Sequence, residues 1–158
     1  MSLAVIAPIA AVLLVVIDQL LKRWATAALA KGSITLISGV FSLTYHENFG
    51  AAFGIMQNRR PILIAATVII MAGAIWLICS GRIKGRLLTW SVTLIVAGGV
   101  GNLIDRVANG YVVDYIYFEL INFPIFNFAD SCVVVGTCLM ILYVLVDERQ
   151  KGRKELKQ

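Results

Sequence analysis

The sequence has few charged residues and no disulfide framework. Only 15% of its 158 residues are charged and 59% are hydrophobic, and the mean hydropathy is +0.86. A soluble domain of this length would expose much of that apolar surface to water. Cys79, Cys132 and Cys138 all lie inside apolar runs, so we interpret them as small packing residues rather than as bridges. The chain is therefore predicted to be a single integral membrane domain over residues 1–158.

The sequence also lacks the motifs of several common catalytic sites. Its single histidine, His46, begins the run HENF, which is not the HExxH motif of zinc proteases. No G-x-S-x-G elbow occurs, and the glycines of residues 98–101 do not follow a strand, as a dinucleotide site requires. The net charge of +5 comes from basic residues beside apolar runs, which fits membrane topology better than a nucleic-acid surface. We therefore expect no metal, no cofactor and no nucleic-acid partner.

Long apolar runs are what the sequence does contain. A helix of about 22 residues rises about 33 Å, enough to cross the hydrocarbon core. The first run leads into Asp18, Lys22 and Arg23 rather than a cleavage site, so we expect it to be retained as a span. The prediction is an all-α membrane protein with four transmembrane helices, at approximately residues 3–24, 61–79, 87–104 and 130–146.

Basic residues predict the orientation of these spans. Arg82, Lys84 and Arg86 share one side with the basic tail that follows the last span. The positive-inside rule makes that side, with both termini, cytoplasmic. Residues of about 25–60 and 105–129 then lie on the extracytoplasmic side, although Lys31, Arg59 and Arg60 dilute the charge bias there.

A small extracytoplasmic β region is predicted at residues 33–53 and 111–118. In residues 41–46 apolar and polar residues alternate, which is typical of a half-buried strand. Asn109 and Gly110 form a turn signal before a run rich in β-branched and aromatic residues. Between these strands lies NFGAAFG, Asn48 to Gly54, whose small residues permit close approach to a ligand. A plain turn is the alternative interpretation.

Polar residues at helix ends are the next candidates. Asp18 and Lys22 are four residues apart and share one helix face. They form either an interfacial ion pair with a snorkelling lysine or part of an inward-facing polar site. Asn102 and Arg106 share a face beyond the glycines of residues 98–101, with Asp105 beside them. Those glycines indicate close helix packing, and the polar residues beyond them could simply close the helix end.

Asp114 and Asp130 are the carboxylates best suited to chemistry. Ionisable groups at membrane depth are costly and are functional candidates by default. Asn127 is placed as the N-cap of the last helix, with Asp130 at its third position, and capping alone could explain both residues. Two carboxylates brought close together share a proton, so one can activate water while the other protonates a carbonyl oxygen. That pattern favours amide hydrolysis without a metal.

Other interpretations stay open from the residues alone. A serine and lysine dyad is one, although no serine has an obvious partner. A small proton or cation carrier is another, and it predicts charges distributed through the membrane depth. A purely structural subunit is a third, but it gives no reason for polar groups to converge on one side.

Five sequence blocks resemble those of one known family, in the family's order and over nearly the whole chain. The blocks are DQLLK at 18–22, NFGAAFG at 48–54, GNLIDR at 101–106, VVDYI at 112–116 and FNFAD at 126–130. Together they are similar to the motifs of bacterial lipoprotein signal peptidase, also called signal peptidase II. Each block alone is weak, whereas the five together are specific.

The resemblance implies a membrane aspartic endopeptidase that removes signal peptides from diacylglyceryl-modified prolipoproteins, cleaving before the lipidated cysteine. It implies an enzyme of the bacterial inner membrane that contacts membrane lipid, and we expect it to act as a monomer. Asp114 and Asp130 would be the catalytic pair. Residues that would bind substrate or support the site are Asn48, Gly50, Phe53, Asn102, Asp105, Arg106, Asn127, Asp18 and Lys22.

Overall fold

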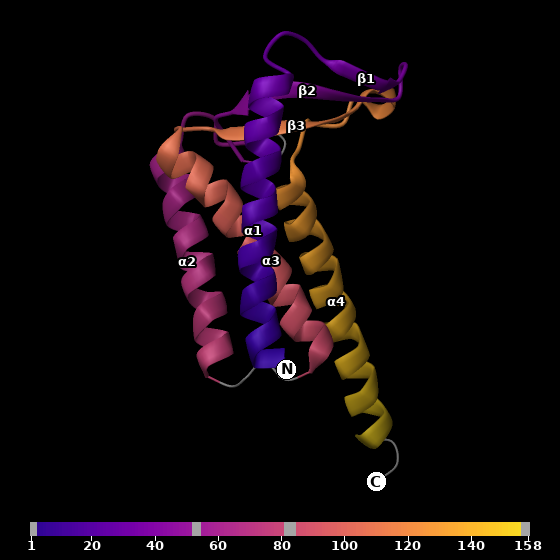
Figure 1. The fold of residues 1–158 in the computed structure, drawn as a ribbon. Coiled ribbons are helices and arrows are strands. Elements are labelled where there is room, and N and C mark those ends of the chain that lie inside the picture. The colour runs from indigo at the N-terminus through magenta and orange to yellow at the C-terminus, as the bar shows by residue number, and fades with distance from the viewer. Residues whose placement is uncertain (1–2, 52–54, 81–84, 156–158) are drawn as a thin grey trace.

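Four long helices stand beside one another, and a small sheet covers one end of them (Figure 1). The computed structural model describes residues 3–51, 55–80 and 85–155. The helices are α1 (Leu3–Ala28), α2 (Arg60–Cys79), α3 (Arg86–Ala108) and α4 (Phe128–Glu155). The strands are β1 (Ile34–Ile37), β2 (Phe41–Asn48) and β3 (Val112–Phe118), followed by the short 3-10 helix η2 (Glu119–Ile121).

All four helices are long and apolar enough to cross a membrane. Both ends of the described chain lie at the pole of the bundle opposite the sheet (Figure 1). Helix α3 packs against each of the other three helices. The predicted class, a four-helix membrane protein with a small β region, is confirmed.

Three helices extend beyond the apolar runs that predicted them. Helix α1 continues to Ala28 rather than ending near Trp24, because Ala25 and Leu29 pack in a buried cluster with Val113 and Tyr115 of β3. Helix α3 continues four residues past 104, to Ala108, and α4 runs on through the charged tail to Glu155. Hydropathy marks the lipid-crossing part of a helix, whereas these extensions depend on packing and on helix-forming residues.

The sheet is antiparallel, with strand order β1-β2-β3. Strands β2 and β3 pair so that His46 lies opposite Asp114 and Asn48 lies opposite Val112. The run after β3 returns and pairs with it again, since the backbone N–H of Ile116 and that of Phe126 each bond the other's carbonyl oxygen, at 2.8 and 3.1 Å. This double pairing brings the start of α4 next to β3.

Glycine lets the helices approach closely at the sheet end of the bundle. A Cβ added at Gly98 would collide with the backbone oxygen of Ala129, and one at Gly101 would lie 2.5 Å from Oδ2 of Asp18. The helix-packing interpretation of these glycines is confirmed. Helices α1, α3 and α4 therefore meet where their polar residues are concentrated.

Candidate active site

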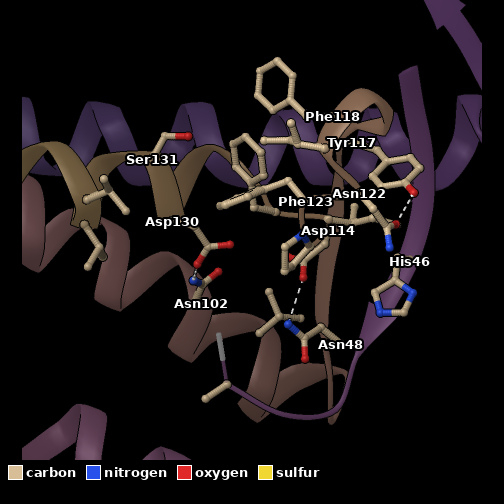
Figure 2. A pocket seen from close by; sticks show the side chains of 18 of the residues that line it. His46, Asn48, Asn102, Asp114, Tyr117, Phe118, Asn122, Phe123, Asp130 and Ser131 are labelled. Carbon is tan, nitrogen blue, oxygen red and sulfur yellow. Dashed lines mark hydrogen bonds between the residues drawn. The ribbon is translucent and has the colours of Figure 1, made fainter. Parts of the chain in front are cut away.

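Asp114 and Asp130 lie on the wall of one cavity of about 880 Å³. The cavity is bounded by β2, β3, the end of α3, the start of α4 and the segment 121–126. Figure 2 shows the two aspartates at this pocket, with Asn48 below Asp114 and Asn102 below Asp130. Residues 114 and 130 come from different elements, so the site exists only in the folded chain.

Strand β3 turns Asp114 toward the cavity. Successive side chains of a strand point to opposite faces, and Val113 and Tyr115 pack against α1 on one of them. Asp114 takes the other face, where it lines the cavity although only 1% of its surface is exposed. The apolar neighbours thus dictate where the carboxylate points.

Helix α4 positions Asp130 through its N-terminal cap. The side-chain oxygen of Asn127 accepts the backbone N–H of Asp130 at 2.8 Å, and Oδ2 of Asp130 accepts the backbone N–H of Asn127 at 3.2 Å. This is the reciprocal capping box expected from the spacing. The positive end of the helix dipole favours a negative charge at that position.

Three asparagine amides hold the two carboxylates. Asn127 donates to Oδ1 of Asp114 at 2.6 Å, and Asn48 donates to Oδ2 of the same residue at 2.9 Å. Asn102 donates to Oδ1 of Asp130 at 2.7 Å. Both carboxylates are therefore held in place at the wall of the cavity by amide donors.

The turn after β2 carries Asn48 and is tied to α3. The backbone N–H of Gly50 donates to Oδ1 of Asn48 at 2.9 Å, and Arg106 donates to the carbonyl oxygen of Gly50 at 2.8 Å. A Cβ at Gly50 would lie 2.8 Å from the carbonyl oxygen of Ile55, so the turn needs glycine there. Phe53, which we expected to contact substrate, lies outside the described residues.

Behind the carboxylates lies a buried cluster of charges. Nζ of Lys22 lies 2.9 Å from Asp18 and 3.0 Å from Asp105. Lys22 and Asp18 are only 3% and 1% exposed, which rules out the snorkelling alternative and makes this an inward-facing group. Oδ1 of Asp18 accepts the backbone N–H of Ala129 at 3.0 Å, so the cluster also anchors the start of α4.

Asp105 belongs to this cluster rather than to its neighbour Arg106. It accepts hydrogen bonds from Gln19 at 3.0 Å and from the backbone N–H of Val113 at 3.1 Å, besides its ion pair with Lys22. Asp105 therefore joins α1, α3 and β3, and we interpret it as a supporting residue.

The cavity environment changes the acidity of Asp114. Burial raises its pKa to about 7, and the charge of Asp130 acts in the same direction, while the amides of Asn48 and Asn127 partly oppose it. Desolvation and a like charge both disfavour a carboxylate anion. Asp114 therefore keeps its proton up to about neutral pH.

Two residues that the sequence analysis does not assign to the site also lie in it. Gln19 donates to Asp18, to Asp105 and to the carbonyl oxygen of Gly101. His46 lines the cavity directly opposite Asp114 in the sheet register. The alternation of β2 places His46 on its polar face, which was a usable signal, whereas Gln19 was marked only by lying inside the DQLLK block.

The described residues also bear on the alternatives. Lys22, the buried lysine, contacts two carboxylates and an asparagine instead of a serine. Within residues 3–51, 55–80 and 85–155, no three His, Cys, Asp or Glu side chains form a group that could hold a metal ion. The buried charges among them gather at the sheet end, rather than through the membrane depth as a carrier predicts.

Comparison with known proteins identifies the family. A family model described as signal peptidase (SPase) II matches residues 10–146. The chain belongs to the signal peptidase II family. The matched range includes both cavity aspartates, and membership makes the protein a peptidase.

Its relatives match the chain over most of their length. A protein named lipoprotein signal peptidase from Streptococcus thermophilus (strain CNRZ 1066) is 42% identical over 142 residues, covering 89% of this chain and 93% of the relative. One of the same name from Clostridium tetani (strain Massachusetts / E88) is 37% identical, covering 90% and 94%. A solved structure described as a bacterial membrane enzyme has a TM-score of 0.86 and 32% identity, covering 92% and 90%. This chain thus shares its fold with a bacterial membrane enzyme, which agrees with its four helices that can cross a membrane.

Proposed function

We propose that this protein is a membrane aspartic endopeptidase that removes the signal peptide from diacylglyceryl-modified prolipoproteins, cleaving before the lipidated cysteine. Asp114 and Asp130 are its catalytic residues. The observation that carries the proposal is that these two carboxylates, from β3 and α4, line one cavity and are each held by asparagine amides. Family membership supplies the reaction class.

The two aspartates divide the chemistry between acid and base. In this proposal Asp130, which lies at the positive end of α4 and close to the charges of Arg106 and Lys22, carries the single negative charge of the pair. Asp114 holds the proton. This division matches the general rule that unlike surroundings separate the roles of paired carboxyl groups.

Hydrolysis then proceeds in two steps. Asp130 takes a proton from a water molecule while the oxygen of that water bonds to the scissile carbonyl carbon. At the same time Asp114 gives its proton to the carbonyl oxygen. The resulting gem-diol collapses when one of its hydroxyl protons returns to Asp114. The C–N bond breaks as Asp130 protonates the leaving amine, and the pair regains its starting charge.

The cavity suits a substrate that is part peptide and part lipid. Its polar end carries the two aspartates, and its other walls include Phe123, Phe126 and the α4 residues Val133 and Val134. Val134 is 61% exposed on the outside of the bundle, so this wall is continuous with the surface that faces lipid. The diacylglyceryl chains lie along this wall in the proposed complex, which places the neighbouring peptide bond at the aspartates.

The proposed location is the bacterial inner membrane, with both termini in the cytoplasm and the sheet on the extracytoplasmic side. An active site at the sheet end of the helices reaches a substrate whose scissile bond is held at the membrane interface. The proposal includes a monomer as the active form, and one chain supplies the proposed catalytic pair and its supporting residues.

A cleavage assay on purified protein tests the catalytic assignment. The substrate is a diacylglyceryl-modified prolipoprotein with a metal chelator present, and the variants are Asp114→Asn, Asp130→Asn and Asp105→Asn, with Glu119→Gln as a matched control. Loss of the acid or the base lowers kcat by at least about 100-fold, while Glu119→Gln cleaves like wild type. Asp105→Asn is expected to retain part of the activity, because it supports the site without touching substrate.

Three outcomes would contradict the proposal. Full cleavage by folded Asp114→Asn or Asp130→Asn would exclude these two aspartates as the catalytic pair. If a prolipoprotein that lacks the diacylglyceryl group is cleaved as fast as the modified one, the lipid is not required. The protein would then still be a signal peptidase, but one that does not select lipid-modified substrates. If wild type cleaves neither substrate, a proteoliposome transport assay tests the carrier alternative.

A further inference from the structure

The ammonium group of Lys22 makes a third contact that the ion pairs do not explain. Besides Asp18 and Asp105, it donates to Oδ1 of Asn102 at 2.8 Å. Asn102 donates its amide N–H to Asp130 at 2.7 Å. A buried cation on α1 is thus joined to a catalytic carboxylate on α4 through one side chain of α3.

This contact decides which way the amide of Asn102 points. An amide has an acceptor oxygen and a donor nitrogen, whereas an ammonium group can only donate. The oxygen of Asn102 must therefore face Lys22, and its nitrogen must face Asp130. The reversed amide would place its oxygen against the carboxylate and two donors against each other.

The other two asparagines are also oriented from behind, but by neutral groups. The backbone N–H of Gly50 fixes Asn48, and the backbone N–H of Asp130 fixes Asn127. All three amides consequently present N–H groups to the aspartates. Asn102 differs because a side-chain charge makes the shorter of the two bonds to its oxygen, 2.8 Å from Lys22 against 3.2 Å from the amide of Asn127, and a single substitution can remove that charge.

We propose that Lys22 is a positioning residue that keeps Asp130 in its charged, water-activating form by orienting the amide of Asn102. The inference rests on the proposed roles of Asp114 and Asp130. Without the ammonium group, only the longer bond from the amide of Asn127, at 3.2 Å, still holds the oxygen of Asn102 away from Asp130. An amide turned with its oxygen toward Asp130 favours the protonated acid. As the pH falls, Asp130 is then protonated, and so lost as the base, at a higher pH than in wild type.

The other charged groups around Asp130 do not take over this role. The titratable or charged groups that face it are Asp114 from β3, Lys22 from α1 and Arg106 from α3, and His46 of β2 lines the same cavity. Arg106 bonds the carbonyl oxygens of Gly50 and Asn102, so it holds backbone rather than the side-chain amide of Asn102. The amide of Asn127 does bond the oxygen of Asn102, but at 3.2 Å and without a charge.

The pH profile of cleavage tests the proposal, with Arg23→Met as the control for Lys22→Met. Arg23 is the next residue on α1 and its side chain is exposed. In Lys22→Met the acidic limb of kcat is expected to move up by about one pH unit, with a tenfold lower rate on that limb and little change in KM. Arg23→Met is expected to keep the wild-type profile. A lysine that only stabilised the fold would lower the amount of active enzyme at every pH without moving the limb.

Two further variants keep the test decisive if Lys22→Met folds poorly. Lys22→Met/Asp105→Asn removes one positive and one negative charge and so leaves the net charge of the cluster unchanged. Asn102→Leu leaves both ion pairs of Lys22 in place and is expected to show the same shifted limb. In Lys22→Met/Asn102→Leu the two effects should not add, because both act on one contact.

Infrared difference spectroscopy across the same pH range separates this inference from the proposed function. The method follows the protonation of Asp130 through its carboxyl band, which is assigned by its absence in Asp130→Asn. It does not require the protein to cleave a substrate. If the protonation of Asp130 shifts in Lys22→Met although wild type cleaves nothing, the proposed function fails and the positioning role stands. A wild-type profile and titration in folded Lys22→Met or in Asn102→Leu overturns the positioning role while leaving the peptidase in place.

Discussion

At the scale of single residues, Asp114 sets a pH dependence that can be measured. Burial and then the charge of Asp130 raise its pKa to about 7. The acid needed for catalysis is present below that pH and is lost as the pH rises through it. We therefore expect kcat/KM for cleavage to fall by about tenfold per unit above about pH 7, with the apparent value belonging to the coupled pair.

The measurement is a pH series of initial rates on the lipid-modified substrate. A series in Glu119→Gln should give the same alkaline limb, since Glu119 lies in η2 and outside the cavity wall. A rate that stays level well above neutral pH would show that Asp114 is not the acid.

Residue spacing predicted the local contacts of the site, but it could not predict the contacts between residues far apart in the sequence. The four-residue spacing of Asp18 and Lys22 and the capping box of Asn127 and Asp130 are properties of one helix each. The bond from Asn48 to Asp114 joins residues 66 positions apart. No periodicity within one segment specifies such a pair. The family resemblance brought the distant blocks together, whereas burial decided between an interfacial and an inward-facing Lys22.

At the scale of the helices, Gly98 allows α3 and α4 to meet. A Cβ there would collide with the backbone oxygen of Ala129, which cannot move aside as a flexible side chain can. Gly98→Ala is expected to push the helices apart and destabilise the protein by about 1–3 kcal/mol, the usual cost of overpacking. Because Ala129 immediately precedes Asp130, activity should fall as well.

Gly73→Ala is the matched control, because nothing lies within 4 Å of a Cβ at Gly73 of α2. Helix propensity then predicts a neutral effect or a gain of up to about 1 kcal/mol. Unfolding of both variants in detergent measures the difference. Equal stability of Gly98→Ala and Gly73→Ala would refute the close-packing explanation.

At the scale of the whole molecule, hydropathy and alternation predicted the class of fold because each reflects one dominant contact. Apolar runs reflect contact with lipid, and the alternation of residues 41–46 reflects a strand with one face, that of Leu43 and Tyr45, packed on the core cluster. Helix ends depend on tertiary packing instead. The last turn of α3, with Asp105 paired to Lys22, therefore lies beyond the apolar run that predicted the helix.

The arrangement of the whole chain also makes the proposed orientation testable. The sheet lies at one end of the bundle and the described chain ends lie at the other (Figure 1), so one accessible position on each side is enough. Ser38, beside the turn between β1 and β2, and Arg149, near the end of α4, are both exposed. In a variant without native cysteines, Ser38→Cys should react with a membrane-impermeant maleimide in intact cells with a permeable outer envelope. Arg149→Cys should react only after lysis, because the positive-inside rule places the basic tail in the cytoplasm. Labelling in the opposite order would place the aspartates on the cytoplasmic side, where a substrate exported through the membrane could not reach them.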